Sequence, residues 1–165
     1  MIHPTCLEVL ATVQTTFSRD IVPKLDDIEA RSAAATIEHL LRHVALRIEH
    51  EGEFLTTDIA RLSALLSRTA DWMESRGAGN PGSVRDLLAG EERAVGSYRS
   101  LEALGSAALA LRGALVEVQE LLHARDEGDS EAADIHEAVR EYIGLQLTDE
   151  AKLIEPAFSG QGPRR

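Results

Sequence analysis

Apolar side chains recur at spacings of three and four residues through the second half of the chain. This spacing places them on one face of an α-helix, and so long an apolar face is typical of a helix that packs against other helices along its length. The seam consists of Leu101, Leu104, Ala108, Leu111, Leu115, Val118 and Leu122. The pattern predicts a long helix from about residue 91 to about residue 125.

Similar periodicity predicts helices over residues 4–21, 27–52, 56–76 and 130–155, with a short helical turn over 83–90. We expect the second of these helices to begin at the capping residues Asp26 and Asp27 and to end near Gly52. The run 77–82, rich in glycine and containing Pro81, is the strongest break in the chain. We expect Ser130 to cap the last helix and Pro156 to close it.

No alternation typical of strands and no repeat of fixed period is found in the sequence. The predicted fold class is therefore all-α, an up-and-down helical bundle of four principal helices plus short helical pieces. A chain of 165 residues fits one domain. We expect a single helical-bundle domain over residues 1–158 and a disordered tail over 159–165, a segment rich in glycine and charge.

Composition narrows the classes of partner. Aromatic residues are only 4% of the chain, so Leu, Ile, Val and Ala must supply most of the core. The formal net charge of −11 argues against binding to nucleic acid or to an anionic membrane surface, because phosphate contacts need clustered Lys and Arg. Cys6 is the sole cysteine, and neither a signal peptide nor a membrane span is recognisable. We expect a soluble, cytoplasmic protein.

Two sets of side chains are candidate metal ligands, although we expect no resident cofactor. His39, His43 and His50 fall on one face of the predicted second helix. Glu120 and His123 have the Glu-x-x-His spacing that di-iron carboxylate bundles use, but those sites need two such pairs. The alternative interpretation of both sets is a solvated polar face, since a transition metal requires ligands that converge from several elements.

Three aromatic residues mark a candidate pocket between helices, Trp72, Tyr98 and Tyr142. Packing in the core is the alternative role for each of them. The sequence contains no phosphate-binding glycine loop, no nucleophile elbow and no Cys-x-x-Cys pair. Nucleotide-binding and hydrolase functions therefore have no support, and an enzymatic role is the less favoured interpretation.

These observations favour a non-enzymatic protein that acts through association, as a homodimer formed by an apolar helix face. Small residues let helices approach closely, and apolar residues remain beside the strict seam. The predicted interface residues are Gly105, Leu109, Gly113 and Val116. Two alternatives remain open: a bundle that binds a metal or small molecule through the candidate residues above, and an accessory subunit of an unrelated enzyme.

Overall fold

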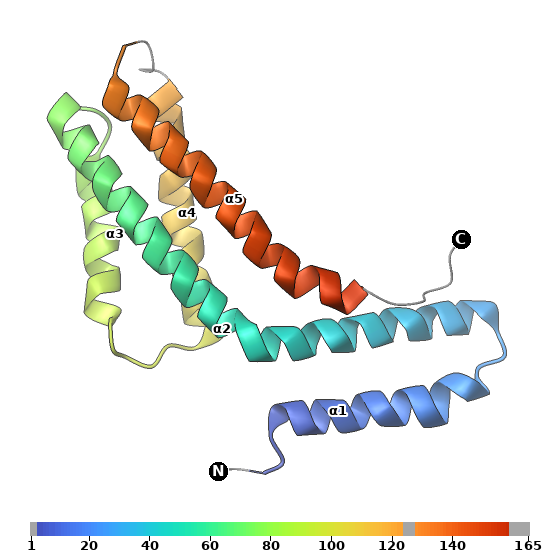
Figure 1. Cartoon of the computed structure of the whole chain (residues 1–165). Helices are drawn as coiled ribbons and strands as arrows, with labels where there is room; N and C mark the ends of the chain where they lie inside the picture. The colour runs from blue at the N-terminus through green and yellow to red at the C-terminus, as the bar shows by residue number, and fades with distance from the viewer. Residues whose placement is uncertain (1–2, 124–127, 159–165) are drawn as a thin grey trace. The chain divides into compact units, whose positions relative to one another are not determined.

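A computed structural model describes residues 3–123 and 128–158 and confirms the all-α fold class (Figure 1). No strand occurs in these residues. The elements are α1 (Cys6–Thr16), the π-helical turn η1 (Phe17–Ile21), the 3₁₀ turn η2 (Val22–Lys24), α2 (Ile28–Arg76), α3 (Pro81–Ala94), α4 (Leu101–His123) and α5 (Ser130–Phe158). The predicted tail at 159–165 lies outside the described residues.

The chain forms two compact units. One, which we call the hairpin unit, comprises residues 1–52 and 149–165, and the other, the bundle unit, comprises residues 53–148. Helices α2 and α5 contribute to both units. The single domain expected from chain length stays a prediction.

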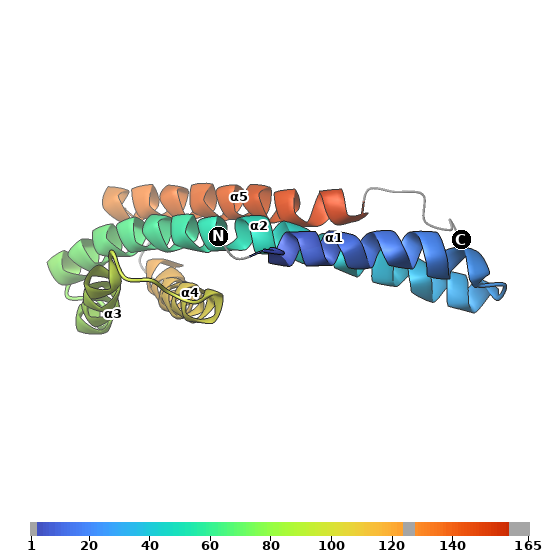
Figure 2. The ribbon, with the colours of Figure 1, turned by 90° about the horizontal axis from the view of Figure 1, so that it is seen from below.

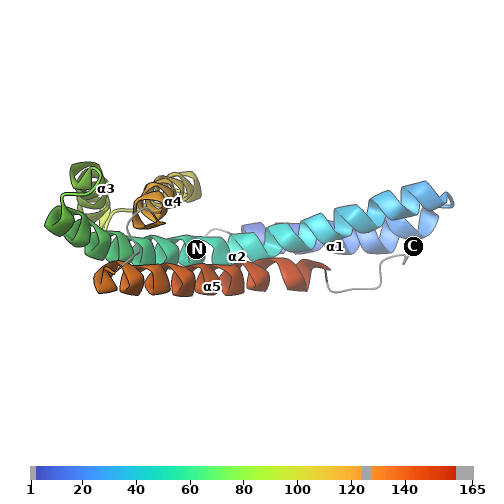
Figure 3. The ribbon, with the colours of Figure 1, turned by 90° about the horizontal axis from the view of Figure 1, so that it is seen from above.

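The bundle unit is built from the second half of α2, then α3, α4 and most of α5, which run alternately up and down (Figure 1). In Figures 2 and 3, α5 lies along α2 on one side, while α3 and α4 lie on the other side of α2. Five residues of the predicted seam are buried on α4. They are Ala108, Leu111, Leu115, Val118 and Leu122. The sequence therefore identified the core-facing side of α4.

The turn between α2 and α3 follows the predicted break. Gly77 and Gly79 adopt positive φ values of 59° and 60°, which only glycine tolerates readily. A Cβ on Gly79 would also press against the ends of the Leu121 and Met73 side chains, which would have to shift. Helix α3 then begins at Pro81, a favoured first helical residue.

Three predicted helix boundaries are wrong. Helix α2 continues through Gly52, because one glycine costs a helix only about 1 kcal/mol and neighbouring interactions offset it. The break expected at Gly90 lies instead at residues 95–100, where Gly96 has φ 80° and the Ser100 hydroxyl caps α4 by accepting a bond from the Ala103 amide at 3.2 Å. Helix α5 extends past Pro156 to Phe158.

In the hairpin unit, α1 and the first half of α2 run antiparallel (Figure 1). Thr5 and Glu8 form a reciprocal capping box at the start of α1. Asp27 caps α2, as predicted, by accepting a bond from the Ala30 amide at 2.8 Å. Ala34 is the one buried apolar residue among the described residues of this unit, so almost no core forms within it.

Two leucines on α4 allow a test of which face of this helix packs in the core. Leu111 is 1% exposed and Leu109 is 71% exposed. We expect Leu111→Ala to lower the free energy of unfolding by about 2 to 5 kcal/mol, because it removes buried methyl groups and leaves a cavity. Leu109→Ala should change it by less than about 0.5 kcal/mol. Urea denaturation followed by circular dichroism measures both, and equal losses would contradict the observed orientation of α4.

Candidate functional site

A buried carboxylate joins three helices of the bundle unit. Asp58 on α2 is 8% exposed, and its two oxygens have different partners. Oδ2 accepts a hydrogen bond from Nη2 of Arg112 on α4 at 2.7 Å, and Oδ1 accepts one from the hydroxyl of Tyr142 on α5 at 2.9 Å. Both oxygens of the ion are thus satisfied, which a carboxylate removed from water requires.

The Asp58 cluster is suited to holding helices together. Burial, together with the neighbouring Asp58 carboxylate, raises the pKa of Tyr142 to about 12, so its hydroxyl remains a neutral donor at ordinary pH. A general base must reach a substrate proton directly or through one water molecule. Asp58 is instead enclosed and already bonded on both oxygens. The cluster therefore links α2, α4 and α5 and offers no exposed reactive group.

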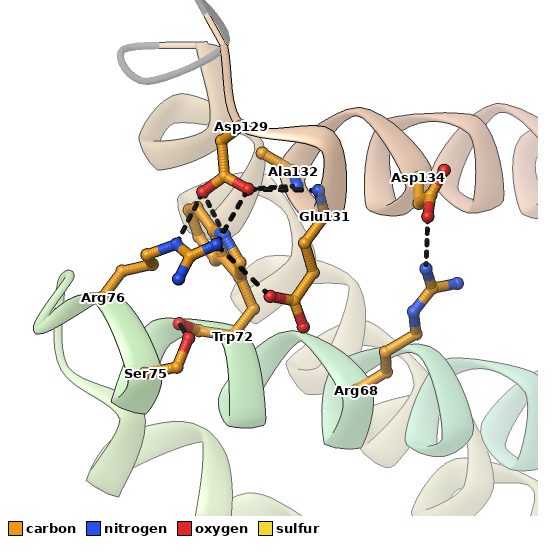
Figure 4. Close-up of polar contacts among 8 residues, drawn as sticks. All are labelled: Arg68, Trp72, Ser75, Arg76, Asp129, Glu131, Ala132 and Asp134. Atoms are coloured by element: carbon orange, nitrogen blue, oxygen red, sulfur yellow. Dashed lines mark hydrogen bonds and ion pairs between the residues drawn. The ribbon is translucent and has the colours of Figure 1, made fainter.

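A second carboxylate, Asp129, connects the start of α5 to the end of α2 (Figure 4). Its Oδ2 accepts bonds from Nε1 of Trp72 at 3.1 Å and from Nε of Arg76 at 2.8 Å. Its Oδ1 accepts bonds from the backbone amides of Glu131 at 3.1 Å and Ala132 at 3.3 Å. Asp129 therefore caps α5 in place of the predicted Ser130 and also satisfies the buried indole.

The charge of Asp129 is stabilised by its partners. The Arg76 guanidinium, and after it the Trp72 indole, hold the pKa of this carboxyl well below its usual range. Arg76 also lies 3.6 Å from the Glu131 carboxylate. Figure 4 shows these groups meeting between the facing ends of the two helices. All the acceptors of Asp129 are occupied by the helix junction, which makes it a structural element of the bundle unit.

The histidines proposed as metal ligands on α2 have separate partners. His39 Nδ1 lies 3.2 Å from Arg42, and His43 Nδ1 lies 3.3 Å from the backbone oxygen of Leu153 within the hairpin unit. His50 lies 3.9 Å from the carboxylate of Glu49. In residues 3–123 and 128–158, no group of three or more His, Cys, Asp or Glu side chains is arranged to hold a metal ion. Metal binding stays a hypothesis.

Glu120 and His123 are both exposed on α4, and His123 has other partners. Its Nδ1 donates to the backbone oxygen of Gln119 at 3.0 Å. Its ring makes an edge-to-face contact with His136 of α5, with centroids 5.0 Å apart. No local pattern in the sequence indicates this pair of imidazoles, since the two residues belong to different helices.

The three aromatic residues proposed to line a pocket are not brought together. Trp72 and Tyr142 lie in the core, bonded to Asp129 and Asp58 respectively. Tyr98 lies in the loop between α3 and α4 and is 97% exposed. A cavity of about 800 Å³ is present in the bundle unit, and Tyr98 lines it while the other two do not.

The predicted interface residues lie on an accessible strip of α4. Leu109 and Val116 are 71% and 56% exposed. A Cβ built on Gly105 or Gly113 would meet no described heavy atom within 4 Å, so these glycines are not used for close packing inside the described chain. Self-association through this strip stays a prediction.

Comparisons with protein-family models, with curated protein sequences and with solved structures give no match to this chain. Among the described residues, no helix combines the length and the apolar character needed to cross a membrane. Inference about function therefore rests on the chain's own surfaces and cavities.

The lowered pKa of Asp129 predicts that the free energy of unfolding depends on pH in the acid range. Because its pKa is lowered by folding, the stabilisation it provides is present above the unfolded value of about 4 and is lost as the pH falls towards the lower folded value. We expect Asp129→Asn to be less stable than the wild type at pH 7, with the difference narrowing below about pH 4. Urea denaturation at pH 7, 4 and 3 measures this difference.

The matched control for that experiment is Asp134→Asn, on the same helix. Asp134 is exposed and only loosely paired with Arg68, at 3.9 Å (Figure 4). This variant should unfold at nearly the wild-type urea concentration. A pH-independent loss in Asp129→Asn, or an equal loss in the control, would contradict the role assigned to the Asp129 charge.

The raised pKa of Tyr142 predicts that the free energy of unfolding falls as the pH rises in the alkaline range. Its pKa is raised by folding, so its contribution to stability is complete below about pH 10 and is lost as the pH rises towards 12. We expect wild-type stability to fall between pH 9 and pH 11 more steeply than that of Tyr142→Phe, which has no phenol to titrate at this position. Urea denaturation across this range tests the sign, and parallel curves would refute it.

Proposed function

We propose that this protein is a non-enzymatic helical module that forms a homodimer through the apolar surface of its hairpin unit. The observation that carries the proposal is a stripe on the first half of α2, which we call the α2 stripe. It consists of Ile37, Leu40, Val44 and Ile48, which are 43%, 55%, 45% and 44% exposed. Their spacing of three, four and four residues places them within one helical face.

The described residues of the hairpin unit leave this stripe about half exposed. Ala34 is its one buried apolar residue in the described segments, whereas the bundle unit buries a continuous core. On α1, Val9 and Val13 are each 48% exposed as well. Contiguous exposed apolar surface of this kind marks an interaction site. Full burial of an exposed aliphatic side chain contributes roughly 1.5 to 3 kcal/mol. Because these side chains are already about half buried, each gains roughly half of that, and a twofold interface counts each residue twice.

The distribution of charge favours a second copy of this surface over a charged partner. Residues 1–52 contain five Lys and Arg against eight Asp and Glu, a formal net charge of −3. Residues 53–148 contain nine against seventeen, a net charge of −8. Joining two hairpin units therefore brings the less charged parts of two acidic chains together. The repulsion that opposes dimerisation is smaller there than across the bundle unit.

Several charged side chains of the hairpin unit pair with one another. Arg47 forms an ion pair with Glu51, and Lys152 forms one with Asp149 at 2.6 Å. Such local pairs leave little charge to select a basic or acidic partner, so apolar contact supplies the affinity. We accordingly expect the dimer to persist in high salt.

A cytoplasmic location belongs to the same proposal. The single cysteine, Cys6, is a free thiol exposed on α1. A lone exposed thiol fits a reducing compartment, where protein disulfides are rare.

The dimer is tested by sedimentation equilibrium on the untagged full-length chain. We expect a species of twice the 17.9 kDa chain mass at both low and high salt. The double variant Ile37→Glu/Val44→Glu should sediment as a monomer, because burying four carboxylates in a twofold interface is strongly unfavourable. Circular dichroism at 222 nm confirms that the variant remains helical.

The matched control is Leu109→Glu/Val116→Glu on the exposed strip of α4. It should remain dimeric under the same conditions. A monomeric wild type would refute self-association, and a control that dissociates while the α2-stripe variant stays dimeric would move the interface to α4.

A further inference from the structure

The bundle unit contains a cavity of about 800 Å³ that lies apart from the Asp58 and Asp129 clusters. Its walls are α2, α3, the loop at 95–100 and the start of α4. This volume lies within the range of about 300 to 1,000 Å³ typical of sites for small molecules. It opens to solvent on one side, since Ala60, Val95 and Tyr98 of its wall are exposed.

The cavity results from small side chains on the facing helices. Ala60, Ser63 and Ser67 lie at helical spacing along one face of α2, and Ala89 faces them from α3. Larger aliphatic residues at these positions would occupy part of this space. Apolar lining predominates, with Ile59, Leu88 and Leu104 contributing larger surfaces.

One polar group of the wall lacks a partner. The hydroxyl oxygen of Ser63 is buried and makes no hydrogen bond with any described residue. A buried hydroxyl left unbonded costs about 1 to 3 kcal/mol. This oxygen is enclosed as it stands, and rotation of the Ser63 side chain about χ1 would turn it towards the cavity, where a ligand with a hydrogen-bonding group can satisfy it and a purely apolar ligand cannot.

The charges at the rim disfavour an anionic ligand. Arg99 is paired with Glu91 at 2.5 Å, and both side chains are about one-fifth exposed. Arg85 is paired with Asp71 and with Glu74, the latter at 3.2 Å. Each guanidinium is therefore already neutralised by carboxylates. The charge that remains at the rim is negative. An incoming carboxylate, sulfonate or phosphate would find no free cation.

Two apolar side chains of the loop stand exposed at this cavity. Val95 is 81% exposed and Tyr98 is 97% exposed, and both contribute to its lining. An apolar ligand would cover part of their surface, which supplies a favourable contribution to binding.

From these observations we propose that the cavity binds a neutral, mostly apolar small molecule that carries one or two hydrogen-bonding groups. The walls supply apolar contact, the hydroxyl-bearing face of α2 supplies hydrogen bonding, and the paired rim excludes anions. This site is independent of the α2 stripe, since every residue that lines it belongs to the bundle unit.

The probe for this site is N-phenyl-1-naphthylamine, a neutral pair of aromatic groups joined by one N–H. Titrated into the untagged full-length chain, it should give saturable fluorescence with one molecule bound per chain. Its sulfonated derivative, 8-anilino-1-naphthalenesulfonate, has the same ring system plus one negative charge. We expect that derivative to bind at least tenfold more weakly, because the rim arginines are already paired.

Substitutions in the wall of the cavity test whether the probe binds there. Ala60→Leu/Ser67→Leu should weaken binding of the neutral probe at least tenfold by occupying the space, and Ser63→Ala should weaken it about threefold. The matched control is Ala64→Leu, an exposed position on the same helix, which should bind as the wild type does. The dimer variant Ile37→Glu/Val44→Glu should also retain binding.

Three results would overturn the proposal. They are the absence of saturable binding, equal affinity for the neutral and sulfonated probes, and unchanged binding in the cavity-filling variant while its thermal unfolding remains cooperative. Loss of binding in the α2-stripe variant alone would likewise overturn it, since the probe would then be bound to the hairpin unit.

Discussion

The buried Asp58 carboxylate is the constraint on which the arrangement of the bundle unit depends. A desolvated ion is tolerated only where its oxygens are hydrogen-bonded, and its two partners come from two other helices, Arg112 on α4 and Tyr142 on α5. Sliding α4 or α5 by one residue would break these bonds and leave a charge buried without compensation. At the other end of the bundle unit, Asp129 holds the start of α5 against the end of α2 by accepting hydrogen bonds from Trp72 and Arg76.

The two units divide apolar surface and charge differently. The bundle unit buries a continuous apolar core and carries most of the net negative charge, whereas the hairpin unit leaves a stripe of aliphatic residues about half exposed and carries a smaller net negative charge. Within the bundle unit, packing is close around Leu66, Leu111 and Ile135 but open between α2 and α3, where Ala60, Ser63 and Ser67 leave a cavity. Both features are departures from a uniformly filled helical core, and each supports a proposal about binding.

Much of the fold could be predicted from local patterns. The seam of α4, the break before Pro81 and the cap at Asp27 all follow from neighbouring residues in the sequence. The predictions were wrong where a weak local signal competes with its surroundings. Gly52 does not end α2, because the penalty for one glycine is small. The break between α3 and α4 lies at Gly96, which adopts positive φ, and not at Gly90.

The candidate sites could be predicted far less well, for a physical reason. Sequence alone determined helical class, most core-facing positions and an acidic charge balance, since periodicity and composition act locally or over the whole chain. Only the tertiary structure joined Asp58 to Tyr142, which is 84 residues away, and Trp72 to Asp129, which is 57 residues away. It also decided that Trp72 is core while Tyr98 lines a cavity. Contacts between helices depend on their rotation and register, which the residues of one helix do not specify.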